Sequence, residues 1–127
     1  MEKTVFVVDD EQAVRKVLTK AFERAGYSVE NAEDAETALA MLESKTYHVF
    51  FIDMKLPGMD GMELAHHIRE KNPFVCLFAM TGYSALFELA TCREAGFDDY
   101  FTKPLDIPGV IKATGEAFNK VARWLKL

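Results

Sequence analysis

The sequence predicts a single α/β domain in which helices cover both faces of a parallel sheet. Short continuous apolar runs alternate five times with amphipathic stretches along the chain. Strands that are buried on both faces carry such continuous runs, whereas half-exposed strands alternate apolar with polar residues. Alternation of strands with helices is typical of the α/β class. The length of 127 residues suits one domain of this kind.

The first strand–helix unit shows the pattern clearly. An apolar run at 4–8 stops at Asp9 and Asp10, and the stretch 11–25 then has helical periodicity. Gly26 follows where a helix C-cap is expected. The residues expected on the inward face of this helix are Val14, Val17, Leu18, Ala21 and Phe22.

The remaining elements follow from the same alternation. A second strand is expected over 27–32, and Asp34 is a suitable N-cap for the helix after it. The third strand, over 49–52, ends at Asp53. The later elements are a helix between the turn at 56–61 and Asn72, a strand over 75–80, a helix over 84–95, a strand over 100–102 and a last helix from near Asp106.

Composition excludes several classes of protein. The net charge of -5 argues against a nucleic-acid binder, because a phosphate backbone requires a basic surface. No apolar run approaches the roughly 18 residues that a membrane span needs, and the first residues do not resemble a signal peptide. Cys76 and Cys92 lack metal-ligand spacing and are expected to be buried, reduced thiols. We therefore expect a cytoplasmic protein without a nucleic-acid or membrane partner.

Polar residues stand directly after four of the five expected strands. In open α/β sheets, functional sites form outside the carboxyl ends of the strands. The residues at these ends are Asp9, Asp10, Asp53, Thr81, Gly82 and Lys103. Singly, each has an ordinary explanation; Asp9 or Asp10, for example, could be the N-cap of the first helix. Their coincidence at one edge indicates a site, because a hydrophobic core does not need this set.

The chemistry of this set favours a magnesium ion and a phosphoryl group. Closely spaced carboxylates repel one another unless a cation lies among them, and Mg²⁺ prefers oxygen ligands from one or two carboxylates, water and phosphate. A phosphoryl group could then approach Asp53, because Mg²⁺ and Lys103 would offset the charge on its oxygens. The hydroxyl of Thr81 could donate a hydrogen bond to one of those oxygens.

Over essentially its whole length the chain resembles the receiver domains of two-component response regulators. The segments that carry the resemblance are 7–11, 51–61, 80–82 and 100–104. The resemblance implies one CheY-like receiver domain over 1–127, with a flavodoxin-like sheet of strand order 2-1-3-4-5. It also implies that this chain contains no DNA-binding or catalytic output domain.

The resemblance assigns roles to the residues at the strand ends. Asp53 would accept the phosphoryl group, and Thr81 and Lys103 would bind it. The metal ligands implied are Asp9, Asp10, Asp53 and the backbone carbonyl of Lys55, with Asp10 the more direct ligand of the acidic pair. Tyr100 would move together with Thr81 as a switch, although it could also be an ordinary half-exposed strand aromatic.

The implied function is that of a phosphorelay receiver. It would take a phosphoryl group from a sensor histidine kinase or a histidine phosphotransfer protein and catalyse only its own phosphorylation and dephosphorylation. A downstream protein would dock on the face made by the fourth helix, fifth strand and fifth helix. Two alternatives are an unphosphorylated receiver-like scaffold and an Asp-nucleophile Mg²⁺ phosphohydrolase. The complete acceptor set argues against the first, and adjacent Asp9 and Asp10, in place of Asp-x-Asp, argue against the second.

Some features are particular to this chain. Lys55 and Tyr83 are expected at the mouth of the site, where they would slow loss of the phosphoryl group, unless Tyr83 points to solvent. Adjacent His66 and His67 point about 100° apart on a helix, so they are not expected to share a metal. The apolar residues expected as a docking patch, or alternatively turned into the core, are Ala85, Leu86 and Leu89.

Overall fold

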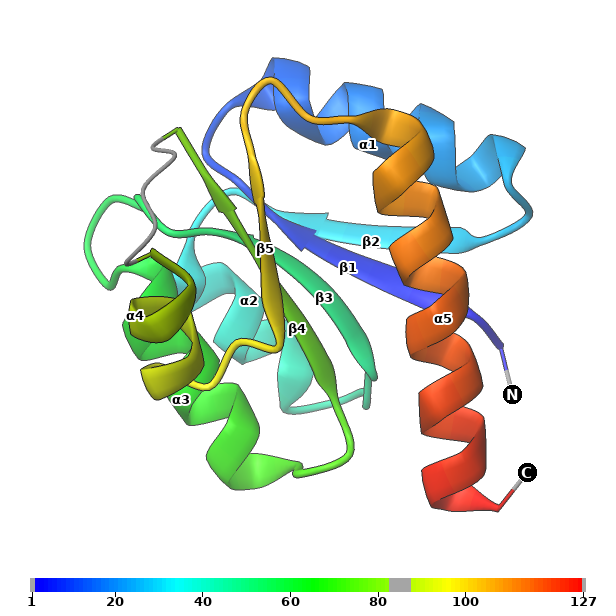
Figure 1. Cartoon of the computed structure of the whole chain (residues 1–127). Helices are drawn as coiled ribbons and strands as arrows, with labels where there is room; N and C mark the ends of the chain where they lie inside the picture. Colours follow the sequence, from blue (N-terminus) through cyan, green and yellow to red (C-terminus); the bar gives the residue numbers. More distant parts are fainter. Residues whose placement is uncertain (1, 83–87, 127) are drawn as a thin grey trace.

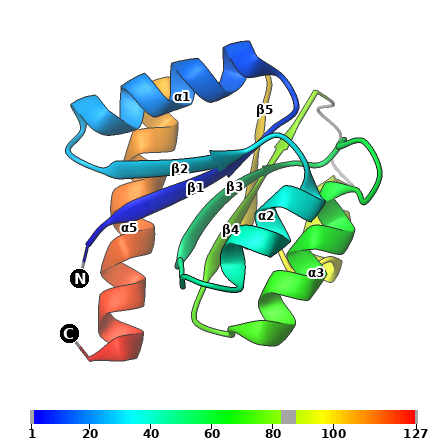
Figure 2. The same cartoon turned by 180° about the vertical axis from the view of Figure 1, so that it is seen from behind.

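The computed structural model describes residues 2–82 and 88–126, and its five parallel strands form one sheet of order β2-β1-β3-β4-β5. Figures 1 and 2 show α1 and α5 on one face of this sheet and α2, α3 and α4 on the other. The elements are β1 (Thr4–Val8), α1 (Gln12–Arg24), β2 (Ser28–Ala32), α2 (Ala35–Leu42), β3 (Val49–Asp53), α3 (Gly61–Lys71), β4 (Cys76–Thr81), α4 (Glu88–Glu94), β5 (Asp99–Thr102) and α5 (Ile107–Leu125). The predicted fold class and strand order are confirmed.

Alternate residues of each buried strand supply the two halves of the core. In β1, Val5 and Val7 pack toward α1 and α5, whereas Phe6 and Val8 pack toward α2 and α3. All five residues of β1 and of β3 are buried, as expected for central strands covered on both faces. The continuous apolar runs therefore reflect burial on both faces, and they leave the strand ends as the places where polar side chains can meet.

Helix ends agree with the expected caps, and element boundaries shift by a few residues. Gly26, just beyond α1, has φ +93°, a left-handed conformation that glycine adopts without steric cost. Asp34 is the N-cap of α2 and accepts a hydrogen bond from the Thr37 N–H at 2.7 Å. Tyr27 precedes β2 instead of opening it, because its N–H donates to the Phe22 carbonyl of α1 at 3.0 Å and not to β1; its ring stacks on Phe118 of α5 with centroids 5.3 Å apart. The expected start of the second strand was therefore one residue early.

One expected core residue is exposed. Leu18 and Phe22 of α1 are fully buried, but 54% of Val17 is accessible to solvent. Val17 lies on the flank of α1 that faces Pro104 and Leu105 across an open hollow, and the hollow leaves its side chain uncovered. The prediction that Val17 points into the core is wrong, because helical spacing places it at the edge of the apolar face and not at its centre.

The fourth helix is described from Glu88 to Glu94, and the expected span of 84–95 extends beyond this range. Two residues of the proposed docking patch, Ala85 and Leu86, lie outside the described residues, and Leu89 is half-buried. Over 2–82 and 88–126, no helix combines the length and apolarity needed to cross a membrane.

Both cysteines are free and buried, as expected. Burial raises the pKa of the Cys76 thiol to about 11, so this thiol remains protonated at neutral pH.

Candidate functional site

The parallel sheet brings the predicted site residues to one edge. Asp53 and Thr81 are the last residues of β3 and β4, Asp9 follows β1 directly and Lys103 follows β5. In Figure 1 the carboxyl ends of these strands point toward the upper edge of the molecule. They surround an open cavity of about 600 Å³. The residues that line this acceptor pocket are Asp10, Glu11, Asp53, Lys55, Thr81, Gly82 and Lys103.

Three carboxylates form the acidic part of the site. Asp9 is fully buried, Asp53 is 6% exposed and Asp10 is exposed. One oxygen of each lies within 4.8 Å of one oxygen of the other two. Oxygen ligands at this spacing fit a hard divalent cation such as Mg²⁺, with one side open for water or a phosphate oxygen. The residues present therefore suit the magnesium ion that the sequence predicts.

Lys103 is the cation of the described site that pairs with these acids. Its Nζ lies 2.8 Å from Asp9 Oδ2 and 3.4 Å from Asp53 Oδ2. The ammonium is also 3.6 Å from Glu11 Oε1, on a largely exposed side chain. One ammonium thus bridges two buried carboxylates and approaches a third, which holds it beside Asp53 Oδ2.

The electrostatics show that this pairing is incomplete. Burial raises the pKa of Asp53 above its usual range, and the charge of Asp9 raises it further, whereas hydrogen bonds from the Lys55 N–H and from Lys103 act in the opposite direction. Burial by itself lowers the pKa of Lys103, but the hydrogen bond to Asp9 and the charges of Asp9 and Asp53 together raise it above its usual value. The ammonium is therefore charged, and the acids around it still carry an excess of negative charge.

Backbone contacts fix Asp53 at the end of β3. Its Oδ1 accepts a hydrogen bond from the Lys55 N–H at 3.1 Å. Gly61, the first residue of α3, donates its N–H to the Met54 carbonyl at 3.1 Å. A Cβ at position 61 would overlap the carbonyl oxygen of Asp53 and lie 2.8 Å from Met54 Cα. Only glycine allows this approach. Position 61 lies in the segment 51–61 that carries the family resemblance, but the sequence alone does not indicate its role.

Two further residues hold Asp9 in place. Arg15 of α1 donates from Nη1 to the Asp9 carbonyl at 2.8 Å, and the Glu11 N–H donates to Asp9 Oδ1 at 2.9 Å. The N-cap of α1 is Glu11 and has no side-chain capping bond, so neither Asp9 nor Asp10 caps the helix. Arg15 was missed by the sequence analysis, because an arginine in the first turns of an amphipathic helix is ordinarily a solvated residue.

The loop after β3 is tied to α2. The Met59 N–H donates to Glu36 Oε2 at 3.2 Å. This loop carries Lys55, whose side chain is exposed at the mouth of the acceptor pocket. Tyr83, the other residue expected at this mouth, lies outside the described residues.

The remaining predicted residues are placed as follows. Thr81 is 4% exposed, and its carbonyl accepts the Lys103 N–H at 2.7 Å, which couples the ends of β4 and β5. Tyr100 is half-buried on the α4 side of the sheet. His66 and His67 are both exposed, and His66 Nε2 lies 3.1 Å from Glu70 Oε1, which agrees with a solvated role.

Comparison with known proteins agrees with this geometry. A family model described as the response regulator receiver domain matches residues 5–114. The chain is 35% identical over 115 residues to the DNA-binding transcriptional regulator NtrC of Salmonella typhimurium, covering 91% of this chain and 24% of that protein. It is 34% identical over 119 residues to a protein of Thermotoga maritima named cyclic di-GMP phosphodiesterase, covering 93% of this chain and 32% of that protein. The chain thus spans about a quarter to a third of the length of these relatives.

Solved structures show the same similarity. The receiver domain protein (CheY-like) of Methanospirillum hungatei superposes with a TM-score of 0.89 at 28% identity, covering 97% of this chain and 98% of that one. The receiver domain of the Francisella response regulator 1452 superposes with a TM-score of 0.87 at 25% identity, covering 94% and 98%. The sheet order, the site at its carboxyl edge and the match over residues 5–114 lead to one conclusion: the chain belongs to the response regulator receiver domains of two-component systems.

Proposed function

We propose that Asp53 accepts a phosphoryl group from a sensor histidine kinase or a histidine phosphotransfer protein, and that this controls binding of a downstream protein. The observation that carries the proposal is the grouping of Asp53 with two further carboxylates and with Lys103 at the end of a buried strand. The family is regulatory, and we propose that the domain catalyses only reactions of its own phosphoryl group. A cytoplasmic location belongs to the same proposal and agrees with two free, buried cysteines.

The roles of the side chains follow from their positions. A carboxylate oxygen of Asp53 attacks phosphorus, a P–O bond forms, and the bond from phosphorus to the donor nitrogen breaks with its electron pair remaining on the imidazole. Lys103, already 3.4 Å from Asp53 Oδ2, moves little to reach a phosphoryl oxygen. Thr81, at the end of the neighbouring strand, donates its hydroxyl to another phosphoryl oxygen.

Asp9, Asp10, Asp53 and the Lys55 carbonyl are the proposed ligands of Mg²⁺. When bound, the ion supplies positive charge that offsets the charge of the phosphoryl oxygens. Asp9, held by Arg15 and Lys103, is fixed before any ligand arrives, whereas exposed Asp10 is free to adjust.

A surface for the phosphodonor protein adjoins the acceptor pocket. An open apolar hollow of about 600 Å³ lies between α1 and the segment after β5, and it shares Glu11 and Lys103 with that pocket. Val17 is largely exposed at this hollow, beside Pro104 and Leu105. A donor that binds here would present its phosphohistidine at the rim of the acceptor pocket. The signal would leave through the face made by α4, β5 and α5, with Thr81 and Tyr100 as the proposed switch.

Acceptor chemistry is tested by mass spectrometry. Incubation with Mg²⁺ and acetyl phosphate should add one phosphoryl mass that base or hydroxylamine removes, and Asp53→Asn should abolish this gain. Asp99→Asn, an exposed acid at the opposite end of the sheet from the acceptor pocket, is the matched control and should label like wild type. Undiminished labelling of the Asp53→Asn protein would overturn the assignment.

The donor surface is tested by comparing two donors. Val17→Asp should lower transfer from a histidine kinase or phosphotransfer protein that phosphorylates the wild type, while phosphorylation by acetyl phosphate stays unchanged. Equal loss with both donors would mean that the substitution damages the acceptor site itself, and no loss with either would remove the hollow from the proposal.

Output coupling is tested with Thr81→Ala. This variant should still accept the phosphoryl group, at a lower rate, but its binding of the downstream protein should no longer depend on phosphorylation. A variant with the wild-type dependence would place the switch elsewhere.

A further inference from the structure

A second cavity lies near the amino ends of β3 and β4, at the opposite end of the sheet from the acceptor pocket. Its volume is about 470 Å³, within the range of protein pockets that hold a ligand or a partner side chain. The apolar part of its wall comes from α2, β3 and α3, through Leu39, Leu42, Phe50 and Ile68. This amino-end cavity plays no part in the proposed phosphoryl chemistry.

The polar part of the wall has one sign of charge. Lys45, His48 and Lys71 line the cavity, and none of the described residues that line it is an aspartate or a glutamate. This is unusual in a chain with 20 acidic and 15 basic residues. An adjoining hollow shares Lys45 and His48 with this cavity, and its lining includes one acid, Glu2. Charge complementarity therefore points to an anionic occupant.

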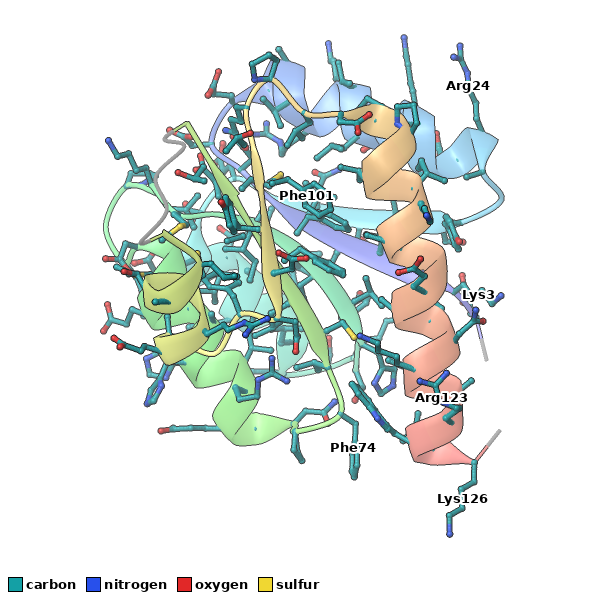
Figure 3. All side chains as sticks on the ribbon, viewed as in Figure 1. Lys3, Arg24, Phe74, Phe101, Arg123 and Lys126 are labelled. Atoms are coloured by element: carbon teal, nitrogen blue, oxygen red, sulfur yellow. The ribbon has the colours of Figure 1, made fainter. Side chains whose placement is uncertain are left out.

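An exposed aromatic side chain lies at the rim of this cavity. Phe74, which lines the cavity, is 44% exposed, and Leu125 at the end of α5 also lines it. Figure 3 shows Phe74 at the lower end of the molecule, the end at which Arg123 and Lys126 of the last turn of α5 and its C-cap also lie. An apolar hollow with aromatic residues and cations around it has the composition of an interface centre and not of an ordinary solvated edge.

The rim is held in place by contacts within the chain. His48 Nδ1 lies 2.9 Å from the Phe74 carbonyl; because a carbonyl only accepts, this ring nitrogen carries the hydrogen. The bond joins the segments before β3 and β4 across the cavity mouth. Lys45 Nζ lies 5.6 Å from the centre of the Tyr47 ring, which holds its ammonium near the opening. The cavity is therefore formed before any partner binds.

Favourable interaction with helix dipoles explains only some of the basic residues at this end of the molecule. Lys71 and Arg123 lie in the last turns of α3 and α5, where cations offset the helix dipole. Lys45, however, lies three residues beyond the end of α2, and a helix dipole gives no reason for Phe74 to be exposed. The apolar wall also has no role in capping a helix.

We propose that the amino-end cavity binds an acidic segment of a partner protein, which inserts an apolar side chain between α2 and α3 while its carboxylates pair with Lys45 and Lys71. An apolar wall beside two lysines favours a protein segment, which offers apolar side chains as well as carboxylates, over a small anion. The cavity lies apart from the phosphodonor hollow beside α1, and of its described lining residues only Leu125, at the end of α5, belongs to an element of the proposed output face. Binding here therefore goes beyond the proposed function.

The test uses a short synthetic peptide in which Leu and Phe alternate with Asp and Glu. Titrated into the whole ¹⁵N-labelled chain, it should shift the amide signals of 45–48 and 71–75, the two segments that line the cavity mouth. A peptide with Ser in place of Leu and Phe, and one with Lys in place of the acids, should each bind at least about tenfold more weakly. Equal binding of the Ser peptide, or shifts that spare both segments, would overturn the proposal.

Variants with matched charge changes sharpen this test. Lys45→Glu with Lys71→Glu should weaken the acidic peptide about tenfold or more, and the milder Lys45→Gln with Lys71→Gln should weaken it less. The control pair Lys16→Glu with Lys20→Glu, exposed on α1, changes net charge equally and should bind within about twofold of wild type. Equal weakening in the control pair would mean that peptide affinity depends only on net charge. Binding of anionic phospholipid vesicles in place of the peptide would assign the surface to a membrane. Either result overturns the proposal.

Discussion

At the carboxyl ends of the strands Lys103 faces three carboxylates, whereas at the amino ends of β4 and β5 Arg69 faces two carbonyls and one carboxylate. Arg69 donates to the Val75 carbonyl at 2.8 Å, to the Gly96 carbonyl at 3.1 Å and to Asp98 Oδ2 at 2.9 Å. Asp98 in turn accepts the Leu77 N–H at 2.8 Å. In this cluster, which we call the Arg69 cluster, one cation meets one anion, and each of the three guanidinium nitrogens of Arg69 donates to an acceptor.

The acceptor site is built in the opposite way. Asp9, Asp10 and Asp53 gather around the ammonium of Lys103, with Glu11 at its edge, so among these four acids and this cation negative charge exceeds positive charge. We call the group of Asp9, Asp10, Asp53 and Lys103 the open cluster, because its charges are not balanced. The balanced Arg69 cluster stabilises the fold, whereas the carboxylates of the open cluster repel one another until a cation binds among them. We therefore expect the Arg69 cluster to contribute to the stability of the fold, and the carboxylates around Lys103 to contribute to ligand binding. Substitutions in each cluster test these two expectations.

The largest effect is expected from Arg69→Ala. Removing the guanidinium leaves the Val75 and Gly96 carbonyls without these bonds and should lower the free energy of unfolding by about 2–3 kcal/mol. Arg69→Lys should recover little, because an ammonium cannot reach three acceptors as a planar fork does. Urea unfolding measures the change, and Arg93→Ala, on the exposed side of α4, should stay within about 0.5 kcal/mol of wild type.

The same variant also tests whether the Arg69 cluster and the acceptor site are independent of each other. Folded Arg69→Ala protein should accept a phosphoryl group from acetyl phosphate at the wild-type rate, since the Arg69 cluster lies at the other end of the sheet. A folded but inactive variant would show that the two clusters are coupled.

Metal binding should respond next. Asp10→Ala removes an exposed carboxylate of the acidic group and should weaken Mg²⁺ binding about tenfold or more, with slower phosphorylation. Without metal the variant should be no less stable than wild type, because one repelling charge has gone. Isothermal titration measures the affinity, and Glu116→Ala on α5 removes an equal charge elsewhere. Wild-type affinity in Asp10→Ala would exclude this carboxylate as a ligand.

Much of this arrangement could be predicted from the sequence. Parallel strands have apolar residues throughout, so their ends are visible as the first charged residue, and Asp9, Asp53 and Lys103 were all found this way. The Arg69 cluster was not found, because its acceptors are mainly carbonyls, which every residue has. Helical periodicity shows which side of α1 is apolar, but it does not show how much of that side the neighbouring elements cover. Val17 was therefore wrongly predicted to be buried.

The fine structure of the site was equally hidden. Gly61 matters because α3 begins against the Asp53 carbonyl, a contact between residues eight apart that no periodicity encodes. Arg15 and Glu36 act through backbone groups of Asp9 and Met59, and their own neighbours in sequence give no sign of it. Side chains that define the chemistry could be predicted, whereas those that position them depend on the folded backbone.

A pH dependence follows from the open cluster. Burial, with the charge of Asp9, raises the pKa of Asp53 above 3.8, so the folded chain holds a proton there that the unfolded chain has lost. Without Mg²⁺, this group therefore contributes a loss of stability as pH rises from about 3.8 through the raised pKa. Asp53→Asn does not titrate, so it should match wild type below this window and be the more stable protein above it. Thermal unfolding over acid to neutral pH measures the difference; a gap that narrows as pH rises would contradict the open cluster.

The smallest effect concerns the lifetime of the phosphorylated protein. Hydrolysis requires a water in line with the P–O bond, opposite Asp53, so side chains at the mouth of the acceptor pocket affect it. Lys55 is exposed at that mouth, where its ammonium can hold a phosphoryl oxygen. Lys55→Ala should therefore shorten the lifetime by about twofold to fivefold, the range expected for one exposed charge pair. Tyr83→Ala tests the second predicted guard.

Decay is followed after removal of the phosphodonor, by the loss of phosphoryl mass with time. Lys45→Ala, at the amino end of the sheet, is the matched control, because it removes the same charge far from the acceptor pocket. The effect of Lys55→Ala should also shrink at high salt, since an exposed charge pair is screened, whereas a change in the packing of the loop would persist. Equal decay of wild type, Lys55→Ala and Tyr83→Ala would show that neither side chain guards the site, and that the open cluster alone sets the lifetime.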